Sequence, residues 1–258
     1  MQLSVVIIGY NSWHFLEKNL DSLAFLYGDP QMEIIYVDNA STDGTPARIR
    51  QRYPTVRVVE NRKNAGISVA RNRGLSLASG KYIWFLDSDT EITEPALHAL
   101  LKFMDETPDA GLCGCKMYGQ DGQVQDSCRK FPSLRGKWKA AVHIILRKLS
   151  GNRLAPSRCL QAYDTNQENP FEVDYVIGAC QLIRREAQAK VGLLDEHIFY
   201  GPEDADFCLR MKQAGYAVYY LPQISIYHAY QRISSHRLFS RITREHLWGL
   251  IYYFWKHR

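Results

Sequence analysis

Two aspartates, Asp87 and Asp89, follow directly on the apolar run at residues 82–86 and are separated by a single residue. Such a run predicts a buried strand, so both carboxylates should emerge at its carboxyl end. That is the edge at which open α/β sheets bind ligands. Crowded carboxylates repel one another there unless a cation neutralises them, and their oxygens suit Mg²⁺ or Mn²⁺. An ion held by one or two carboxylates usually completes its coordination with phosphate oxygens. The pair predicts a metal site for a diphosphate, with an ordinary turn as the alternative.

A third carboxylate, Asp38, ends the apolar run at residues 33–37 and precedes a loop of small polar residues. A carboxylate at this position can accept the imide N–H of a pyrimidine, which selects the base of a nucleotide. The loop residues 41–43 are also good helix caps, and both interpretations can hold together. A basic segment follows, in which Lys63 and Arg71 either reach a diphosphate or belong to a solvated face.

The acidic pair Glu203-Asp204 begins a predicted helix and follows the aromatic segment at residues 199–202. Acidic residues in a first helical turn are favourable with the helix dipole, which is the structural explanation for the pair. The functional explanation is that a carboxylate near a bound cation and a sugar hydroxyl can act as general base. His228 ends a strand-like stretch at residues 224–228. It is either a metal ligand or, as is commoner for a single histidine, an ordinary surface or core residue.

The order of elements predicts an α/β fold. Predicted strands at residues 3–8, 33–37, 56–59 and 82–86 alternate with predicted helices at 12–26, 45–53 and 67–78. This alternation favours a parallel sheet covered on both faces. A strand order of 3-2-1-4 would place Asp38 and Asp87 on the strands that flank the first, at one edge. Beyond them we expect a helix at 94–106, a strand at 111–117 and a basic amphipathic helix at 137–149. Regular structure should return at 172–184, followed by strands at 216–221 and 224–228.

Composition sets broader bounds. The 258 residues, 46% of them hydrophobic, suffice for one large α/β domain or two closely packed halves. A formal charge of +5 gives no argument for nucleic-acid binding. The six cysteines form no CxxC pair, so a zinc site is not expected. The N-terminus enters a strand at once, without the features of a signal peptide, which predicts a cytosolic protein with reduced thiols.

The segments around Asp38, Asp87, Glu203-Asp204 and His228, taken together, resemble the family 2 glycosyltransferases of the GT-A fold. The resemblance runs in the family's order over about residues 3–228. Within the family, the chain is most similar to bacterial rhamnosyltransferase-type enzymes that build surface polysaccharides. The matching segments are SVVIIGYN at 4–11, VDNASTDG at 37–44, NAG at 64–66, ARNRG at 70–74, FLDSD at 85–89, GACQLIRR at 178–185, GPEDADFCLR at 201–210, and His228.

The resemblance implies a GT-A fold, with a Rossmann-like, mostly parallel central sheet flanked by helices. About residues 1–110 would bind the nucleotide sugar and residues 111–228 the acceptor, followed by a helical tail at 229–258. It also implies roles for individual residues. Asp38, Asn64, Arg71 and Asp87 would bind the donor; Asp89 of the DXD motif and His228 would bind Mg²⁺ or Mn²⁺; Asp204 would be the catalytic base of the ED motif, beside Glu203. In the family a Gly and a Ser often follow the His, whereas Ala229-Tyr230-Gln231-Arg232 stands here.

The implied activity is an inverting transfer from a nucleoside diphosphate sugar to a hydroxyl of a glycan or a lipid-linked oligosaccharide. dTDP-rhamnose and UDP-sugars are the candidate donors. One alternative is a nucleotidyltransferase, but the segment at residues 9–13 lacks the glycine-rich basic loop that such an enzyme would favour. The other is a catalytically silent sugar-nucleotide-binding protein, which the retention of both acidic pairs disfavours.

The tail at residues 236–258 is rich in aromatic and basic residues. Its apolar positions 239, 242, 247, 250, 251 and 254 come closest to a helical stripe. This composition is typical of an interfacial helix, and would place the protein peripherally at the cytoplasmic face of the inner membrane, where anionic headgroups attract Arg and Lys. The alternatives are that the aromatic residues pack on the catalytic domain or join a homodimer.

Overall fold

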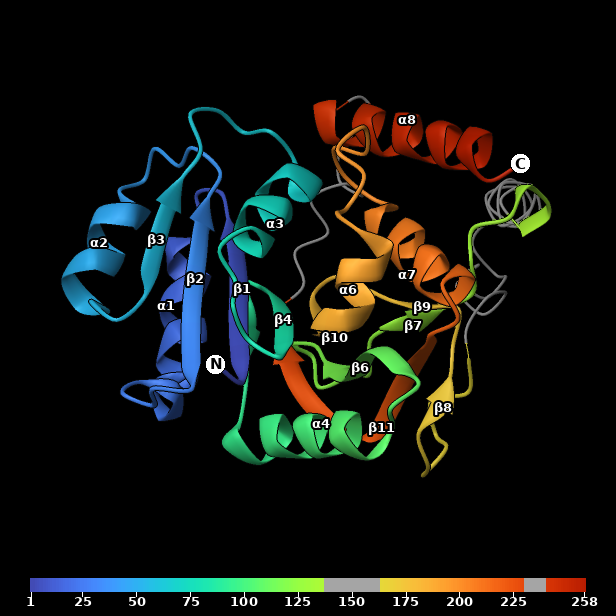
Figure 1. Ribbon diagram of the computed structural model, residues 1–258. Helices are drawn as coiled ribbons and strands as arrows, with labels where there is room; N and C mark the ends of the chain where they lie inside the picture. The colour runs from blue at the N-terminus through green and yellow to red at the C-terminus, as the bar shows by residue number, and fades with distance from the viewer. Residues whose placement is uncertain (137–162, 230–239) are drawn as a thin grey trace.

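A mixed, mostly parallel sheet runs through the whole molecule in the computed structural model, which describes residues 1–136, 163–229 and 240–258 (Figure 1). In the described part of the chain its strand order is β3-β2-β1-β4-β10-β6-β11-β5, and β8 pairs with β11. A small second sheet joins β7 and β9. The strands are β1 (Leu3–Gly9), β2 (Met32–Asp38), β3 (Arg57–Glu60), β4 (Tyr82–Asp87), β5 (Thr90–Glu91), β6 (Ala110–Tyr118), β7 (Cys128–Arg129), β8 (Phe171–Glu172), β9 (Tyr175–Val176), β10 (Cys180–Arg184) and β11 (Ala217–His228).

The first four long strands pair in the predicted order. β1 lies between β2 and β4, parallel to both, and β3 lies outside β2. The register sets Gly9 opposite Asp38 and Ile8 opposite Asp87, so the two carboxylates flank the end of β1. Buried β-branched and aromatic side chains fill β1 and β4, as expected of parallel strands that are covered on both faces.

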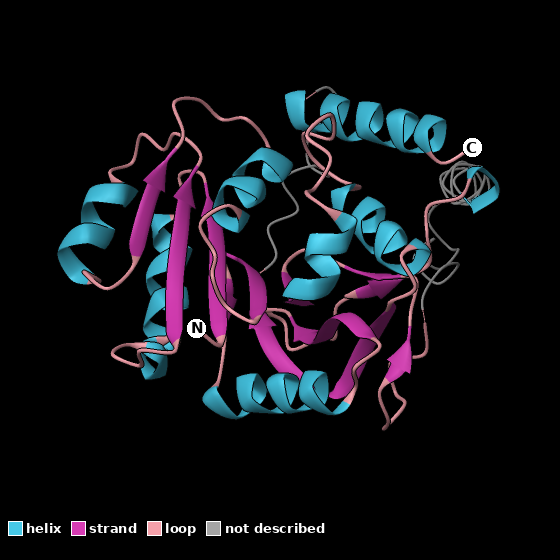
Figure 2. Ribbon diagram, in the orientation of Figure 1, coloured by secondary structure: helices cyan, strands magenta, loops and turns pink. Residues whose placement is uncertain are grey.

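Helices cover both faces of the sheet (Figure 2). Side chains of α1 and α4 belong to one hydrophobic core, and side chains of α3, α6 and α7 belong to the other. The sequence predicted the alternation behind this arrangement, but not α6. The helices are α1 (Trp13–Ser22), the 3₁₀ helix η1 (Ala24–Leu26), α2 (Thr45–Arg52), α3 (Ile67–Leu75), α4 (Glu94–Glu106), α6 (Arg185–Val191), α7 (Glu203–Gln213) and α8 (Arg241–Lys256).

The turn between β4 and β5 connects a central strand of the sheet to the strand at one end of the sheet path. β5 pairs antiparallel with the last residues of β11, which sets His228 opposite Thr90. The buried amide of Asn19 donates to the Thr90 carbonyl oxygen at 2.9 Å, and the Thr90 hydroxyl donates to the Asp87 carbonyl oxygen at 2.9 Å. These bonds fix the turn that carries Asp87 and Asp89.

Three elements differ from the sequence predictions. The strands expected at 216–221 and 224–228 are one strand, β11, with a register shift against β6 between Leu221 and Ser225, around Pro222. Proline removes a ladder donor, which is why the pattern looked interrupted. The helix expected at 12–26 ends at Ser22 and is followed by η1, and the helix expected at 67–78 ends at Leu75. The helix expected at 137–149 lies outside the described residues.

The described part of the tail forms α8, and the predicted apolar stripe is only half right. Tyr253 is buried, and Phe254 packs against the core shared with α7. Leu247 and Ile251 are exposed, as is Trp248. The aromatic residues therefore divide between a face that packs on the domain and a face that points outward. Among the helices of the described residues, none has the length and apolar character needed to cross a bilayer.

Candidate active site

Asp87, Asp89 and His228 form a cluster with the composition of a metal site. One potential ligand atom from each residue lies within 4.8 Å of the others. The His228 Nε2 atom is 3.4 Å from the Asp89 Oδ1 atom, and His228 is only 4% exposed. The pairing of β5 with β11 explains this approach, because it brings the end of β11 beside the turn after β4. Carboxylate oxygens with one imidazole nitrogen fit Mn²⁺ better than a purely oxygen set would.

Gln125 orients the imidazole of His228. The His228 Nδ1 atom lies 2.7 Å from the Gln125 Oε1 atom, and the Gln125 Nε2 atom donates to the His228 carbonyl oxygen at 2.9 Å. Because an amide oxygen only accepts, Nδ1 carries the hydrogen and Nε2 faces the carboxylates. Such an outer partner fixes the tautomer of a ligating histidine. Burial alone would lower the pKa of His228, but the hydrogen bond and charge of Asp89 outweigh it and raise the pKa.

Arg71 connects the two acidic motifs. Its Nη2 atom is 3.0 Å from the Asp87 Oδ1 atom, and its Nη1 atom is 3.3 Å from the Glu203 Oε1 atom. The same guanidinium donates to the Gly178 carbonyl oxygen at 2.8 Å. Arg71 is only 2% exposed, so it is enclosed by these partners and does not project into solvent. Its position suits an indirect part in donor binding, through Asp87.

Gly178 makes room for that guanidinium. A β-carbon built on Gly178 would lie 2.3 Å from the Arg71 Nη1 atom, closer than any real contact. The position lies in the turn before β10, within the segment GACQLIRR whose resemblance to the family was noted from the sequence. The glycine is therefore required by close packing against a charged group.

Glu203 and Asp204 differ in exposure. Glu203 is 5% exposed, and its Oε2 atom is buried without a hydrogen-bond partner among the residues that the structure describes. Burial and the neighbouring Asp204 charge raise the pKa of Glu203 to about 7, against the opposing effect of Arg71. Asp204 is half-buried, and its Oδ1 atom accepts from the Ala205 backbone N–H at 2.7 Å. Of the two carboxylates, Asp204 is the one that a bound molecule can reach.

The loop before α7 rests on α3. The Ile67 backbone N–H donates to the Phe199 carbonyl oxygen at 2.9 Å, and the Ser68 hydroxyl donates to the Ile198 carbonyl oxygen at 2.7 Å. A β-carbon on Gly66 would lie 2.6 Å from that Phe199 oxygen. The helix that carries Arg71 thus also places the segment that leads into Glu203.

The inner face of α8 supports the same segment from the other side. Asp206 is fully buried, and its Oδ1 atom lies 2.7 Å from the Lys256 Nζ atom and 2.8 Å from the His257 Nε2 atom. A β-carbon on Gly249 would lie 2.7 Å from the Gly201 carbonyl oxygen, so glycine permits close contact there. The tail is therefore part of the wall around Asp204.

Asp38 lies at the end of β2 and is 1% exposed. Its Oδ2 atom accepts from the Ser41 backbone N–H at 2.7 Å, and its Oδ1 atom accepts from the Tyr36 hydroxyl at 3.3 Å. Asn64 lies across the loop and is tied down, because its Oδ1 atom accepts from the Asn39 amide at 3.1 Å. The Asn39 amide also donates to the Gly66 carbonyl oxygen at 3.1 Å.

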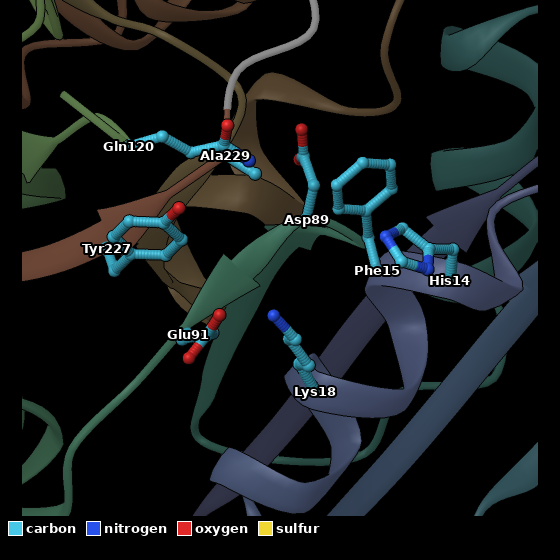
Figure 3. Close-up of a pocket in the computed structure, with 8 residues that line it drawn as sticks. All are labelled: His14, Phe15, Lys18, Asp89, Glu91, Gln120, Tyr227 and Ala229. Atoms are coloured by element: carbon cyan, nitrogen blue, oxygen red, sulfur yellow. The ribbon is translucent and has the colours of Figure 1, made fainter.

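Sequence reasoning assigned no role to several residues that shape the site. Asn39 stood inside a matching motif, so its signal was present, whereas Gln125 meets His228 only across 103 residues of sequence. A small pocket beside Asp89 is lined by α1, and Figure 3 shows the Lys18 amino group and the Glu91 carboxylate pointing toward the same space. The pocket residues are His14, Phe15, Lys18, Asp89, Glu91, Gln120, Tyr227 and Ala229.

Comparison with known structures shows the fold. The chain is similar to TarS of S. aureus (residues 1–349; TM-score 0.61, 20% identity), covering 88% of this chain and 60% of that one. It is also similar to the mannosyltransferase PcManGT of Pyrobaculum calidifontis in complex with GDP-Man and Mn²⁺, with a TM-score of 0.62 and 20% identity over 91% of this chain and 59% of that one. The architecture is that of GT-A glycosyltransferases, and this chain spans about three-fifths of the length of these two.

Sequence comparison shows the family. The model described as glycosyl transferase family 2 matches residues 4–192, and the chain belongs to that family. It is 30% identical to an N-acetylglucosaminyl-diphospho-decaprenol L-rhamnosyltransferase of Mycobacterium tuberculosis over 239 residues, which cover 88% of this chain and 75% of the relative. It is 36% identical to the putative teichuronic acid biosynthesis glycosyltransferase TuaG of Bacillus subtilis over 129 residues, 48% of this chain and 50% of that protein. The protein is a glycosyltransferase that uses nucleotide sugars.

Proposed function

We propose that this enzyme transfers a sugar with inversion from a nucleoside diphosphate sugar to a hydroxyl of a glycan or a lipid-linked oligosaccharide during surface polysaccharide synthesis. Membership of the family argues against the nucleotidyltransferase and the silent binding protein. The mycobacterial relative is a rhamnosyltransferase named for a lipid-linked acceptor, which supports such an acceptor here and makes dTDP-rhamnose a donor to test first. Solved relatives with bound UDP and UDP-GlcNAc keep UDP-sugars as the other candidates.

One observation carries the proposal: the carboxylates of both motifs lie close together, one at the end of β4 and the other at the start of α7, and Arg71 joins Asp87 to Glu203 there. Asp38 flanks the same strand end as Asp87, on the other side of β1. We assign Asp38 to the nucleotide base and Asp87, with Asn64 in the adjoining loop, to the donor. A nucleoside diphosphate would then lie across the end of β1.

Asp89 and His228 would hold a divalent ion, Mn²⁺ or Mg²⁺, with Asp87 beside them. The bound ion would neutralise charge on the leaving diphosphate. Gln125 keeps the His228 Nε2 atom turned toward that position. Arg71 acts through Asp87, because its guanidinium is held by three acceptors and is closed off from solvent.

Asp204 would remove the proton from the acceptor hydroxyl, whose oxygen attacks the anomeric carbon from the face opposite the diphosphate. Its partial exposure at the first turn of α7 suits a group that must touch the acceptor. Glu203 is enclosed beside it and positions the turn through Arg71. A single displacement needs no covalent nucleophile, so the anomeric configuration inverts.

The test combines a donor panel with one substitution. Wild-type protein should hydrolyse or transfer from one class of nucleotide sugar in the presence of Mn²⁺, with dTDP-rhamnose and UDP-sugars tested first. Asp204→Asn should slow transfer by ~10²–10⁴ and leave donor affinity, measured by calorimetry, nearly unchanged. Asp121→Asn, in an exposed turn, is the control. Near-normal turnover by Asp204→Asn would exclude Asp204 as the base.

A further inference from the structure

The outer face of α8 carries an uninterrupted stripe of basic and apolar side chains. Four of the ten large hydrophobic residues that are exposed in the described part of the chain lie on this one helix. Their exposed fractions are 60% for Leu247, 63% for Trp248, 51% for Ile251 and 59% for Trp255. With α-helical spacing, the exposed residues fall in one stripe roughly 120° wide. The stripe, in order, is Arg241, Arg244, Leu247, Trp248, Ile251 and Trp255, and the exposed Arg258 follows the end of the helix.

The stripe cannot turn inward, because the opposite face of α8 is already occupied. Tyr253 is buried against the domain, Gly249 contacts the segment at Gly201, and Lys256 is held by Asp195 and Asp206. Figure 1 shows α8 at the periphery of the molecule, beyond α7. The aromatic residues of the stripe are therefore held outward by the fold.

We propose that this stripe docks on the surface of an anionic lipid bilayer, with α8 lying in the plane of the interface. Tryptophan side chains favour the headgroup region, and the two arginines at the start of the stripe, with Arg258 beyond its end, match the phosphates of anionic lipids. Within the described helix, the acidic side chain nearest the stripe is Glu245, which is paired with Arg241 at 3.8 Å. Charge complementarity therefore favours a phosphate-rich surface over a second copy of this basic stripe.

Docking through α8 would also orient the active site. The inner face of the same helix contacts Gly201 and Asp206, on either side of Asp204. The catalytic segment would therefore lie next to the bilayer surface. If the acceptor is lipid-linked, which rests on the proposed function, docking would hold its sugar on the side of the molecule that carries Asp204.

The experiment measures sedimentation of the full-length protein with vesicles. Wild-type protein should bind vesicles of phosphatidylglycerol and phosphatidylcholine at low salt, bind pure phosphatidylcholine weakly, and dissociate as salt increases. The double variant Trp248→Ser/Trp255→Ser should lose on the order of tenfold or more in affinity, and Arg244→Gln about fivefold. Leu193→Ser removes an apolar side chain that is 53% exposed outside α8, and serves as the matched control.

Donor hydrolysis and sedimentation velocity are measured on the same samples. Unchanged hydrolysis in solution by the double variant separates loss of docking from loss of function or fold. Wild-type protein that fails to bind anionic vesicles at low salt would overturn the proposal, as would equal binding by the double variant. A wild-type dimer that the double variant converts to a monomer would assign the stripe to a second copy of the chain instead.

Discussion

Each carboxylate motif of the site is held by a polar side chain from outside the motif. Gln125 fixes the imidazole that faces Asp89, and Arg71 holds Asp87 and Glu203 together. An arginine this enclosed is rare unless its charge is paired. The reactivity of Asp87, Asp89 and Glu203 is therefore determined as much by these neighbours as by the motifs themselves.

The metal cluster leads to a prediction about donor binding. Asp89→Ala should abolish the Mn²⁺-dependent part of the affinity for UDP or dTDP, because it removes a direct ligand. Gln125→Leu should weaken Mn²⁺ binding by about 10–100-fold, since it releases the orientation of His228. Calorimetry with Mn²⁺ and with a chelator measures both effects, and Gln123→Leu, an exposed neighbour, is the control. Equal nucleotide affinity of the wild type with and without Mn²⁺ would contradict the assignment.

Glu203 leads to a prediction about stability and pH. Its pKa is raised from 4.5 to about 7 in the folded protein, chiefly by burial. Between these values the folded state binds more protons than the unfolded state, so the contribution of Glu203 to stability falls as pH rises from about 5 to 8. Glu203→Gln should remove that slope, which amounts to roughly 2–3 kcal/mol between the two ends.

Urea unfolding at pH 5 and pH 8 measures the slope. The comparison of slopes cancels any constant cost of replacing the carboxylate beside Arg71. Glu168→Gln, at an exposed loop position, should keep the wild-type pH dependence. A Glu203→Gln variant with the same pH dependence as the wild type would show that the carboxyl titrates normally.

Helix α8 is an integral part of the fold and not a free appendage, because its last turn neutralises the buried Asp206. Lys256→Met should leave that carboxylate with Arg210 and His257 alone. We expect this to lower the free energy of unfolding by about 1–3 kcal/mol and to slow turnover, since Asp206 shares the first turns of α7 with Asp204. Thermal unfolding and kcat measure the two effects. Arg258→Met, exposed beyond the helix, should change neither.

The same contacts argue against removing the tail to test its role. Deleting the residues after about position 235 would expose the surface that Tyr253 now covers and leave Asp206 without Lys256 and His257. Loss of activity in such a truncation would report damage to the wall around Asp204. Point substitutions on the outer face avoid this difficulty.

At the scale of the whole molecule, the fold of the first half of the chain was easier to predict from the sequence than that of the second half. Continuous apolar runs in β1, β2 and β4 and amphipathic helices between them specify a parallel sheet, and its order places Asp38 and Asp87. The second half was harder because its pieces are short and their partners are remote. β10 inserts antiparallel between β4 and β6, and the two-residue β5 pairs with β11.

The candidate site was likewise only partly predictable from the sequence. Motif spacing marked the carboxylates, since each follows a strand or begins a helix. It did not reveal that Arg71 is enclosed, because a basic residue in a polar helix is usually solvated. It also did not separate the two faces of α8, because apolar residues occur on both. The division into donor and acceptor halves at about residue 110 remains a prediction.

The bond between Arg71 and Glu203 spans 132 residues of sequence, and this has a consequence for synthesis of the protein. A nascent chain that has folded only its first strands holds Asp38 and Asp87 but has neither Asp204 nor His228. Contacts of such long range form late, because loop closure must precede them. Under the roles proposed for Asp204 and His228, we therefore expect transfer activity only after both α7 and the end of β11 have been synthesised and folded.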